Sequence, residues 1–134
     1  MTSKWTLKGR KALITGGSKG IGKACVDEFL NLGAEVFFAA RTHVEIKKKE
    51  NLFFLNSDLS KNEERIKVIK QIEAKWGKLD ILVNNIGTNI RKKTGDFTDE
   101  QYNKIFDTNL KTCYDMCRLA YPLLKKSSQG NIVN

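Results

Sequence analysis

Short apolar segments alternate along the chain with longer segments in which apolar residues recur every three or four positions. Four of the short segments are bounded by glycine, asparagine or aspartate, and each predicts a buried β-strand. These strands are expected at Lys11–Thr15, Glu35–Ala40, Leu52–Asn56 and residues 81–84. A fifth strand is predicted to open at Gly130, four residues before the last residue, Asn134. Since a domain seldom ends inside a core strand, we expect an N-terminal portion truncated at the start of this strand.

Three segments with helical spacing lie between the strands. The first spans residues 19–32 and ends before Gly33, and the second begins with a capping box of Ser60 and Glu63 and ends at Gly77. The third spans residues 98–126 and begins with a capping box of Thr98 and Gln101. The predicted inward residues of the first helix are Ile21, Ala24, Cys25, Phe29 and Leu32. Those of the second are Ile66, Ile69, Ile72 and Trp76. Those of the third are Tyr102, Ile105, Phe106, Cys113, Cys117, Ala120 and Leu124.

Alternation of strands and helices predicts parallel strands joined by right-handed crossovers. The expected fold class is therefore α/β: a doubly wound, Rossmann-like parallel sheet in three layers, forming one dinucleotide-binding domain over residues 1–134. The connection 41–51 is short, with room for about two helical turns at most, so any helix there should be rudimentary.

The formal net charge of +9 allows three interpretations: a nucleic-acid surface, a bound polyanion such as a phosphorylated cofactor, or a solvated lysine-rich surface. No nucleic-acid-binding motif accompanies the charge, so we expect no nucleic-acid partner. No apolar run is long enough to span a membrane. Cys25, Cys113 and Cys117 have no metal-ligand spacing with the lone His43. We therefore expect no metal site, and reduced thiols in a cytoplasmic protein.

The most specific local pattern is the glycine-rich turn after the first strand, with the sequence Thr15-Gly16-Gly17-Ser18-Lys19-Gly20-Ile21-Gly22. In such a turn Gly16 permits a sharp bend, Gly20 lets the backbone approach a pyrophosphate, and Gly22 lets helix and strand pack closely. The amides and dipole at the helix start favour an anion. We predict a nucleotide-cofactor site here, with an ordinary tight turn as the alternative.

The spacing Gly-x-x-x-Gly-x-Gly, with Thr15 in front, resembles the short-chain dehydrogenase/reductase family. Asp58-Leu59 resembles the family's adenine contact, and Asn84-Asn85-Ile86-Gly87 resembles its Asn-Asn-Ala-Gly motif with isoleucine in place of alanine. Asn109 matches an asparagine that the family keeps in its long helix. Residues 5–9 and 85–92 look most like tropinone-reductase-like members. The cofactor-binding residues expected from the turn and the resemblance are Gly16, Ser18, Lys19, Gly20, Ile21, Gly22, Arg41, Asp58, Leu59, Asn85 and Gly87.

The residue at the end of the second strand indicates which nicotinamide cofactor binds. A cofactor without a 2′-phosphate is usually held by an acidic residue at the end of this strand, whereas a phosphorylated one meets a basic residue. Here the strand ends in Ala39-Ala40-Arg41, and Lys19 matches a second cation that the family uses for the same phosphate. Either cation alone could be a solvated side chain. Together, with no carboxylate in that place, they favour NADP(H) over NAD(H).

Besides the cofactor, reduction of a carbonyl needs a positioned acid that supplies a proton. The resemblance implies a serine and a Tyr-x-x-x-Lys pair beyond Asn134, and Asn109 as the catalytic asparagine that anchors a proton-relay water. Asn109 could instead be a helix residue that bonds its own backbone. Tyr121 and Lys125 fit Tyr-x-x-x-Lys but precede the fifth strand, so we expect them to end the helix, with Tyr121 packed and Lys125 near the last carbonyls.

Two main functions remain open at this point. The first is an NADP(H)-dependent oxidoreductase of small carbonyl or alcohol substrates, of which this chain is the cofactor-binding half and is inactive alone. The second is a non-catalytic nucleotide-cofactor-binding or regulatory module. A nucleic-acid-binding domain is a third alternative. The resemblance also implies that copies could pair through the long helix, residues 98–126.

Overall fold

The computed structural model describes residues 5–134, and its sheet confirms the predicted fold class. Five parallel strands lie in the order β3-β2-β1-β4-β5. Their bounds are Lys11–Thr15 for β1, Glu35–Ala40 for β2, Leu52–Asn56 for β3, Ile81–Val83 for β4 and Asn131–Val133 for β5. The first three agree with the prediction at both ends, whereas β4 ends one residue earlier than expected.

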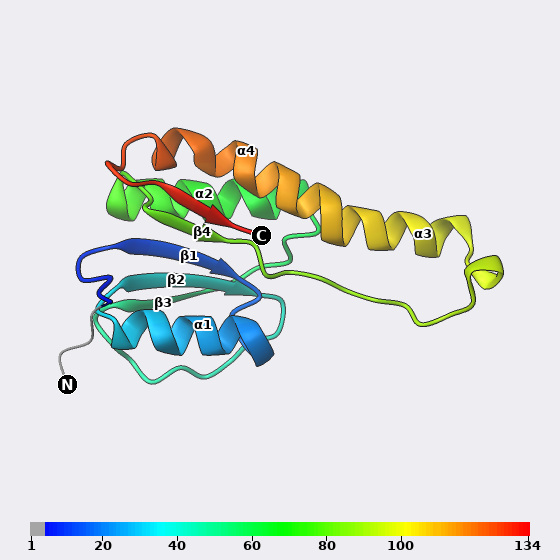
Figure 1. Ribbon diagram of the computed structural model, residues 1–134, viewed down its shortest axis with the longest axis horizontal. Helices are drawn as coiled ribbons and strands as arrows, with labels where there is room; N and C mark the ends of the chain where they lie inside the picture. Colours follow the sequence, from blue (N-terminus) through cyan, green and yellow to red (C-terminus); the bar gives the residue numbers. More distant parts are fainter. Residues whose placement is uncertain (1–4) are drawn as a thin grey trace.

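Helices cover both faces of the sheet, as Figure 1 shows. Helix α1 (Gly20–Asn31) lies on one face, and α2 (Asn62–Trp76) and α4 (Thr112–Leu124) lie on the other. Successive strand side chains point to opposite faces, so Leu13 belongs to the core beneath α2 and α4 while Ile14 belongs to the core beneath α1. This double burial explains why the strands are apolar throughout.

Two predicted features of the first two helices are wrong. Ile21 and Ala24 are exposed, because α1 faces the sheet with Gly22 and Val26 instead. The capping box of Ser60 does not form, because its hydroxyl donates to the Asp58 carboxylate (2.7 Å) and α2 begins after Lys61. The apolar face of α2 is otherwise confirmed, with Ile69 and Ile72 buried and Ile66 and Trp76 half-buried. The left-handed residue that ends α2 is Gly77, as expected.

The connection 41–51 contains no helix. Its half-buried side chains Val44 and Ile46 pack directly against the core on the α1 face. Two side chains of an extended segment therefore cover the area that a crossover helix would otherwise cover.

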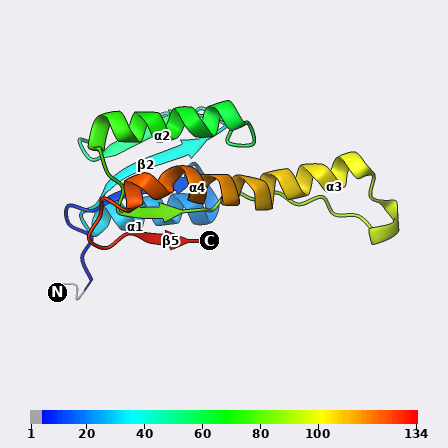
Figure 2. The same cartoon turned by 90° about the horizontal axis from the view of Figure 1, so that it is seen from above.

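The predicted long helix has three parts: α3 (Asp99–Phe106), a π-helical segment η2 (Asp107–Lys111) and α4. A 3₁₀ turn, η1 (Thr94–Asp96), precedes it, and the capping box of Thr98 and Gln101 is confirmed. In both views α3 projects beyond the sheet (Figures 1 and 2). Tyr102 and Phe106 are consequently exposed rather than inward, whereas Ala120 and Leu124 are buried as predicted. Ile105, Cys113 and Cys117 are half-buried.

Candidate functional site

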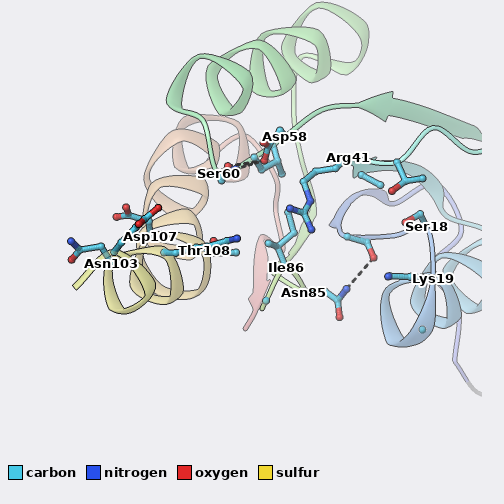
Figure 3. A pocket seen from close by; sticks show the side chains of 18 residues that line it. Ser18, Lys19, Arg41, Asp58, Ser60, Asn85, Ile86, Asn103, Asp107 and Thr108 are labelled. Carbon is cyan, nitrogen blue, oxygen red and sulfur yellow. Dashed lines mark hydrogen bonds between the residues drawn. The ribbon is translucent and has the colours of Figure 1, made fainter. Parts of the chain in front are cut away.

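A cleft of about 1040 Å³ opens at the carboxyl ends of β1, β2, β3 and β4. The segment that follows each of these strands contributes to its lining, and α3 and η2 form the opposite wall (Figure 3). Ligands of open α/β sheets bind in the crevice outside the carboxyl ends of the strands. The cleft is therefore placed where this fold offers a binding site.

Most of the residues predicted to bind a cofactor line this cleft. They are Gly16, Ser18, Lys19, Gly20, Arg41, Asp58, Leu59, Asn85 and Gly87. Two predicted residues are not among the lining residues: Ile21, which is 78% exposed, and Gly22, which is buried behind the turn.

Three glycines of the turn are required for different geometric reasons. Gly16 has φ 69° and Gly20 has φ 57°, a left-handed conformation that favours glycine. Gly22 has no such conformation, but a Cβ atom there would lie 2.1 Å from the Gly16 carbonyl oxygen and 2.4 Å from Asn85 Nδ2. The close packing expected at Gly22 is therefore present.

Thr15 and Asn85 fasten the turn to the neighbouring strand. The Thr15 hydroxyl accepts from the backbone N–H groups of Asn85 (2.9 Å) and Ile86 (3.2 Å). Asn85 Nδ2 in turn donates to the Gly16 carbonyl (3.1 Å). The Asn85 side chain thus stabilises the conformation of the glycine turn. Ile86 lies beside Asn85 in the cleft (Figure 3).

The start of α1 opens into the cleft through Ser18, Lys19 and Gly20. No side chain caps it, and its first turn contains no acidic residue. The first amide groups of a helix have no partners within the helix. With the helix dipole they form a site that suits an anionic group such as a phosphate.

Asp58 is fixed as an anion on the cleft wall. Its carboxylate accepts from the backbone N–H (3.1 Å) and the hydroxyl (2.7 Å) of Ser60. Partial burial alone would raise the pKa of Asp58, but these hydrogen bonds, with the charges of Arg41 and Lys61, hold the pKa below its ordinary value. The negative charge faces the same space as Arg41 (Figure 3).

Sequence reasoning missed two groups of lining residues. The first, Ala40, Thr42, Ser60 and Ile86, consists of direct neighbours of predicted residues, so sequence position could have suggested them. The second comes from α3 and η2 and consists of Glu100, Asn103, Lys104, Asp107 and Thr108. Nothing in the sequence signals that this helix lies against the cleft.

Asn109 lies in the π-helical segment, beside the cleft rather than in its lining. Its Oδ1 accepts from the Thr88 N–H (2.7 Å) and its Nδ2 donates to the Thr88 carbonyl (2.9 Å). It therefore bonds a backbone 21 residues away rather than its own. Tyr121 and Lys125 also lie outside the lining. Helix α4 ends at Lys125 as expected, but Tyr121 is exposed and the Lys125 ammonium lies over its ring (5.6 Å to the centroid).

Residues 5–134 contain no group of three or more potential metal ligands, and Cys25, Cys113 and Cys117 are all free thiols. No helix in the same part of the chain is long and apolar enough to cross a membrane.

Known proteins resemble this chain in sequence. A tropinone reductase homologue of Arabidopsis thaliana is 40% identical over 139 residues, which cover 97% of this chain and 53% of the relative. Senescence-associated protein 13 of the same plant is 39% identical, with 98% and 52% covered. The chain thus spans about half the length of these relatives.

Solved structures share the fold. The ligand-free aldohexose dehydrogenase of Thermoplasma acidophilum matches with a TM-score of 0.87 at 26% identity, over 95% of this chain and 49% of that one. ElxO with NADP bound matches with a TM-score of 0.85 at 32% identity, over 94% and 54%. The sequence model described as short chain dehydrogenase matches residues 10–134. On this match, the glycine turn and the parallel sheet, the chain belongs to the short-chain dehydrogenase family.

Proposed function

We propose that this chain forms the NADP(H)-binding half of an oxidoreductase that interconverts carbonyl and alcohol groups of small molecules. The observation that carries the proposal is the cleft, which combines the glycine turn, the uncapped start of α1 and two cations, Lys19 and Arg41. The family and the tropinone reductase homologues among its relatives support the reaction class.

The preference for a phosphorylated cofactor rests on the end of β2. The residues that follow this strand into the cleft are Arg41 and Thr42, so a 2′-phosphate would meet a guanidinium there. Carboxylates do line the cleft, but Asp58 is bonded to Ser60, and Glu100 and Asp107 belong to the opposite wall. The related ElxO structure, named with NADP bound, supports the same choice.

In this proposal the bound cofactor supplies or accepts a hydride. The start of α1 would hold its phosphates, and Asn109, beside the cleft, would anchor a water that relays a proton. Within the described residues no tyrosine lines the cleft. The proton donor that carbonyl reduction needs would then come from outside these residues, and the chain alone would bind cofactor without turnover.

We further propose that two copies pair through the long helix. Its exposed side chains Tyr102, Phe106, Leu110 and Tyr114 recur every four residues, and the rings of Tyr102 and Phe106 lie 4.4 Å apart. An apolar stripe of this kind is typical of a protein interface.

A cytoplasmic location completes the proposal. The free thiols support a reducing compartment. One Arabidopsis relative is named as chloroplastic, so fractionation of cells that express the full protein is the deciding measurement.

Fluorescence titration with NADPH and NADH tests the cofactor proposal. We expect NADPH to bind more tightly and Arg41→Ala to weaken NADPH binding by about 10- to 100-fold, the loss of one charged hydrogen-bonded contact. NADH binding should be unchanged. Lys47→Ala, an exposed cation of the same β2–β3 connection outside the cleft lining, is the matched control. Equal affinities for the two cofactors, or an Arg41 variant that binds like the control, would refute the proposal.

A further inference from the structure

A buried ion pair lies beneath the wall of the cleft. Arg65, in the first turn of α2, is 1% exposed, and its Nη2 donates to Asp115 Oδ2 of α4 at 2.8 Å. Its Nη1 donates to the carbonyl oxygen of Leu59, also at 2.8 Å. The guanidinium therefore bonds a side chain of α4 and the backbone of the β3–α2 connection together.

A second buried side chain reaches the same carbonyl. Thr112 Oγ1 lies 3.3 Å from the Leu59 oxygen and 2.9 Å from the Asp107 oxygen. Leu59 and Asp107 both line the cleft, on opposite walls. Arg65, Thr112 and Asp115 thus connect the two walls from behind without lining the cleft themselves.

The pair is poorly explained as a source of stability. Moving two charges out of water costs as much as their attraction returns, unless all their hydrogen bonds are made. Here Arg65 Nε is buried without a hydrogen-bond partner. A pair of apolar side chains would fill the same space without that cost, but it could not hold the Leu59 carbonyl.

We propose that Arg65, Asp115 and Thr112 are positioning residues. They hold residues 58–60, which form one wall of the cleft, in the cofactor-binding conformation against the π-helical segment. The proposal rests on the proposed function, since the wall that they hold is the wall of the cofactor cleft. We call these three residues the clamp. A wall that is already ordered does not lose conformational entropy when the cofactor binds, so the clamp raises cofactor affinity.

The informative variant replaces both charges at once. Arg65→Met/Asp115→Leu leaves no unpaired buried charge, so we expect a melting temperature close to that of the wild type. Without the clamp, NADPH should bind about tenfold more weakly, the effect of having to order roughly one loop residue on binding. Hydrogen exchange of the Ser60 and Lys61 amides in the cofactor-free protein should become faster, because both amides bond to Asp58 within the wall.

The matched control removes an ion pair between α2 and the segment that follows α4. Lys126 and Glu73 form an exposed pair (4.0 Å) that does not involve the cleft, so Lys126→Met/Glu73→Leu should keep wild-type affinity and exchange. Thr112→Val removes the hydroxyl that lies between the Leu59 and Asp107 oxygens but keeps the ion pair, so it should give a smaller change in the same direction. It decides the question if the double variant does not fold.

The two proposals fail in different ways. If wild-type protein binds no NADPH, the proposed function is wrong, and the exchange rates alone decide the clamp. Wild-type exchange of the Ser60 and Lys61 amides in the folded double variant, or wild-type NADPH affinity in a protein that binds this cofactor, would overturn the positioning role.

Discussion

At the scale of single residues, the glycine turn shows that glycine can be required at two positions for different reasons. Gly20 needs its left-handed φ but has open space around its Cβ position, whereas Gly22 has an ordinary φ and no space at all. A side chain at Gly20 therefore strains only its own backbone. A side chain at Gly22 pushes the whole turn away from α1.

Gly22→Ala should consequently destabilise the fold and distort the proposed cofactor site. The added methyl would meet the Gly16 carbonyl at 2.1 Å, and overpacking of this kind costs about 1–3 kcal/mol or more. Urea denaturation measures the loss. Gly95→Ala, at an exposed position with open space and no positive φ, should stay within about 0.5 kcal/mol of wild type. Equal stability of the two variants would contradict the packing argument.

Single-residue roles were predictable where the reason is local and not where it depends on distant partners. The left-handed positions of Gly16 and Gly77 follow from the turn and from the helix end. The hydrogen-bond partner of the Asn109 side chain could not be predicted, because Thr88 belongs to a loop whose path no local pattern specifies. The place of Ile86 in the cleft is a local case, because it lies between the predicted lining residues Asn85 and Gly87.

At the scale of elements, Asp80 joins three parts of the chain at the start of β4. Its buried carboxylate accepts from the Lys11 backbone N–H of β1 (2.9 Å) and from the Ser127 hydroxyl in the α4–β5 connection (2.5 Å). Burial alone would raise the pKa of Asp80, but these hydrogen bonds and the Lys78 ammonium outweigh it and lower the pKa. The charged form is therefore the one that the fold stabilises.

The stability that Asp80 contributes should depend on pH. Because its pKa is lower in the folded state, the contribution is present above the ordinary value of 3.8 and is lost as pH falls through the folded pKa. Asp80→Asn should lower the free energy of unfolding by about 1.5–3 kcal/mol at pH 7, with the difference from wild type shrinking in acid. Denaturation curves from pH 7 to 2.5 measure it, and the exposed Asp96→Asn is the control. A difference that stays constant with pH would contradict this role.

Strands were predicted more accurately than helix faces, for a physical reason. The strands are buried on both sides, so an uninterrupted apolar run marks them directly. The inward face of residues 98–126 was wrong at Tyr102 and Phe106, because only the α4 part packs on the sheet. The π-helical segment also adds a residue to one turn and shifts the helical register. Sequence periodicity does not reveal either fact.

At the scale of the whole molecule, the projecting α3 carries apolar surface away from the core (Figure 2). If a second copy covers it, Phe106→Lys should raise the dissociation constant of the dimer about thirtyfold, from the roughly 2 kcal/mol typical of a central aromatic residue. Sedimentation velocity over a concentration series measures it. Gln71→Lys, on the exposed side of α2, should leave the assembly unchanged. A wild-type protein that is monomeric throughout would exclude pairing through this helix.

Much of the cleft could be predicted, but only from one side. The turn after β1, the end of β2 and the segments after β3 and β4 carry recognisable residues, and parallel strands bring their carboxyl ends together. The wall formed by Glu100, Asn103 and Lys104 depends on the direction of a helix distant in sequence. Arg65 and Asp115 are 50 positions apart, and neither belongs to a motif.

The strand order β3-β2-β1-β4-β5 also bears on how the sheet can form during translation. The central strand, β1, leaves the ribosome first, then β2 and β3 extend the sheet on one side, and β4 and β5 extend it on the other. Each newly made strand therefore adds to an edge that already exists, and none has to enter between two paired strands. Assembly can follow the order of synthesis, so a nascent chain need not wait for its last strand before its first ones are paired.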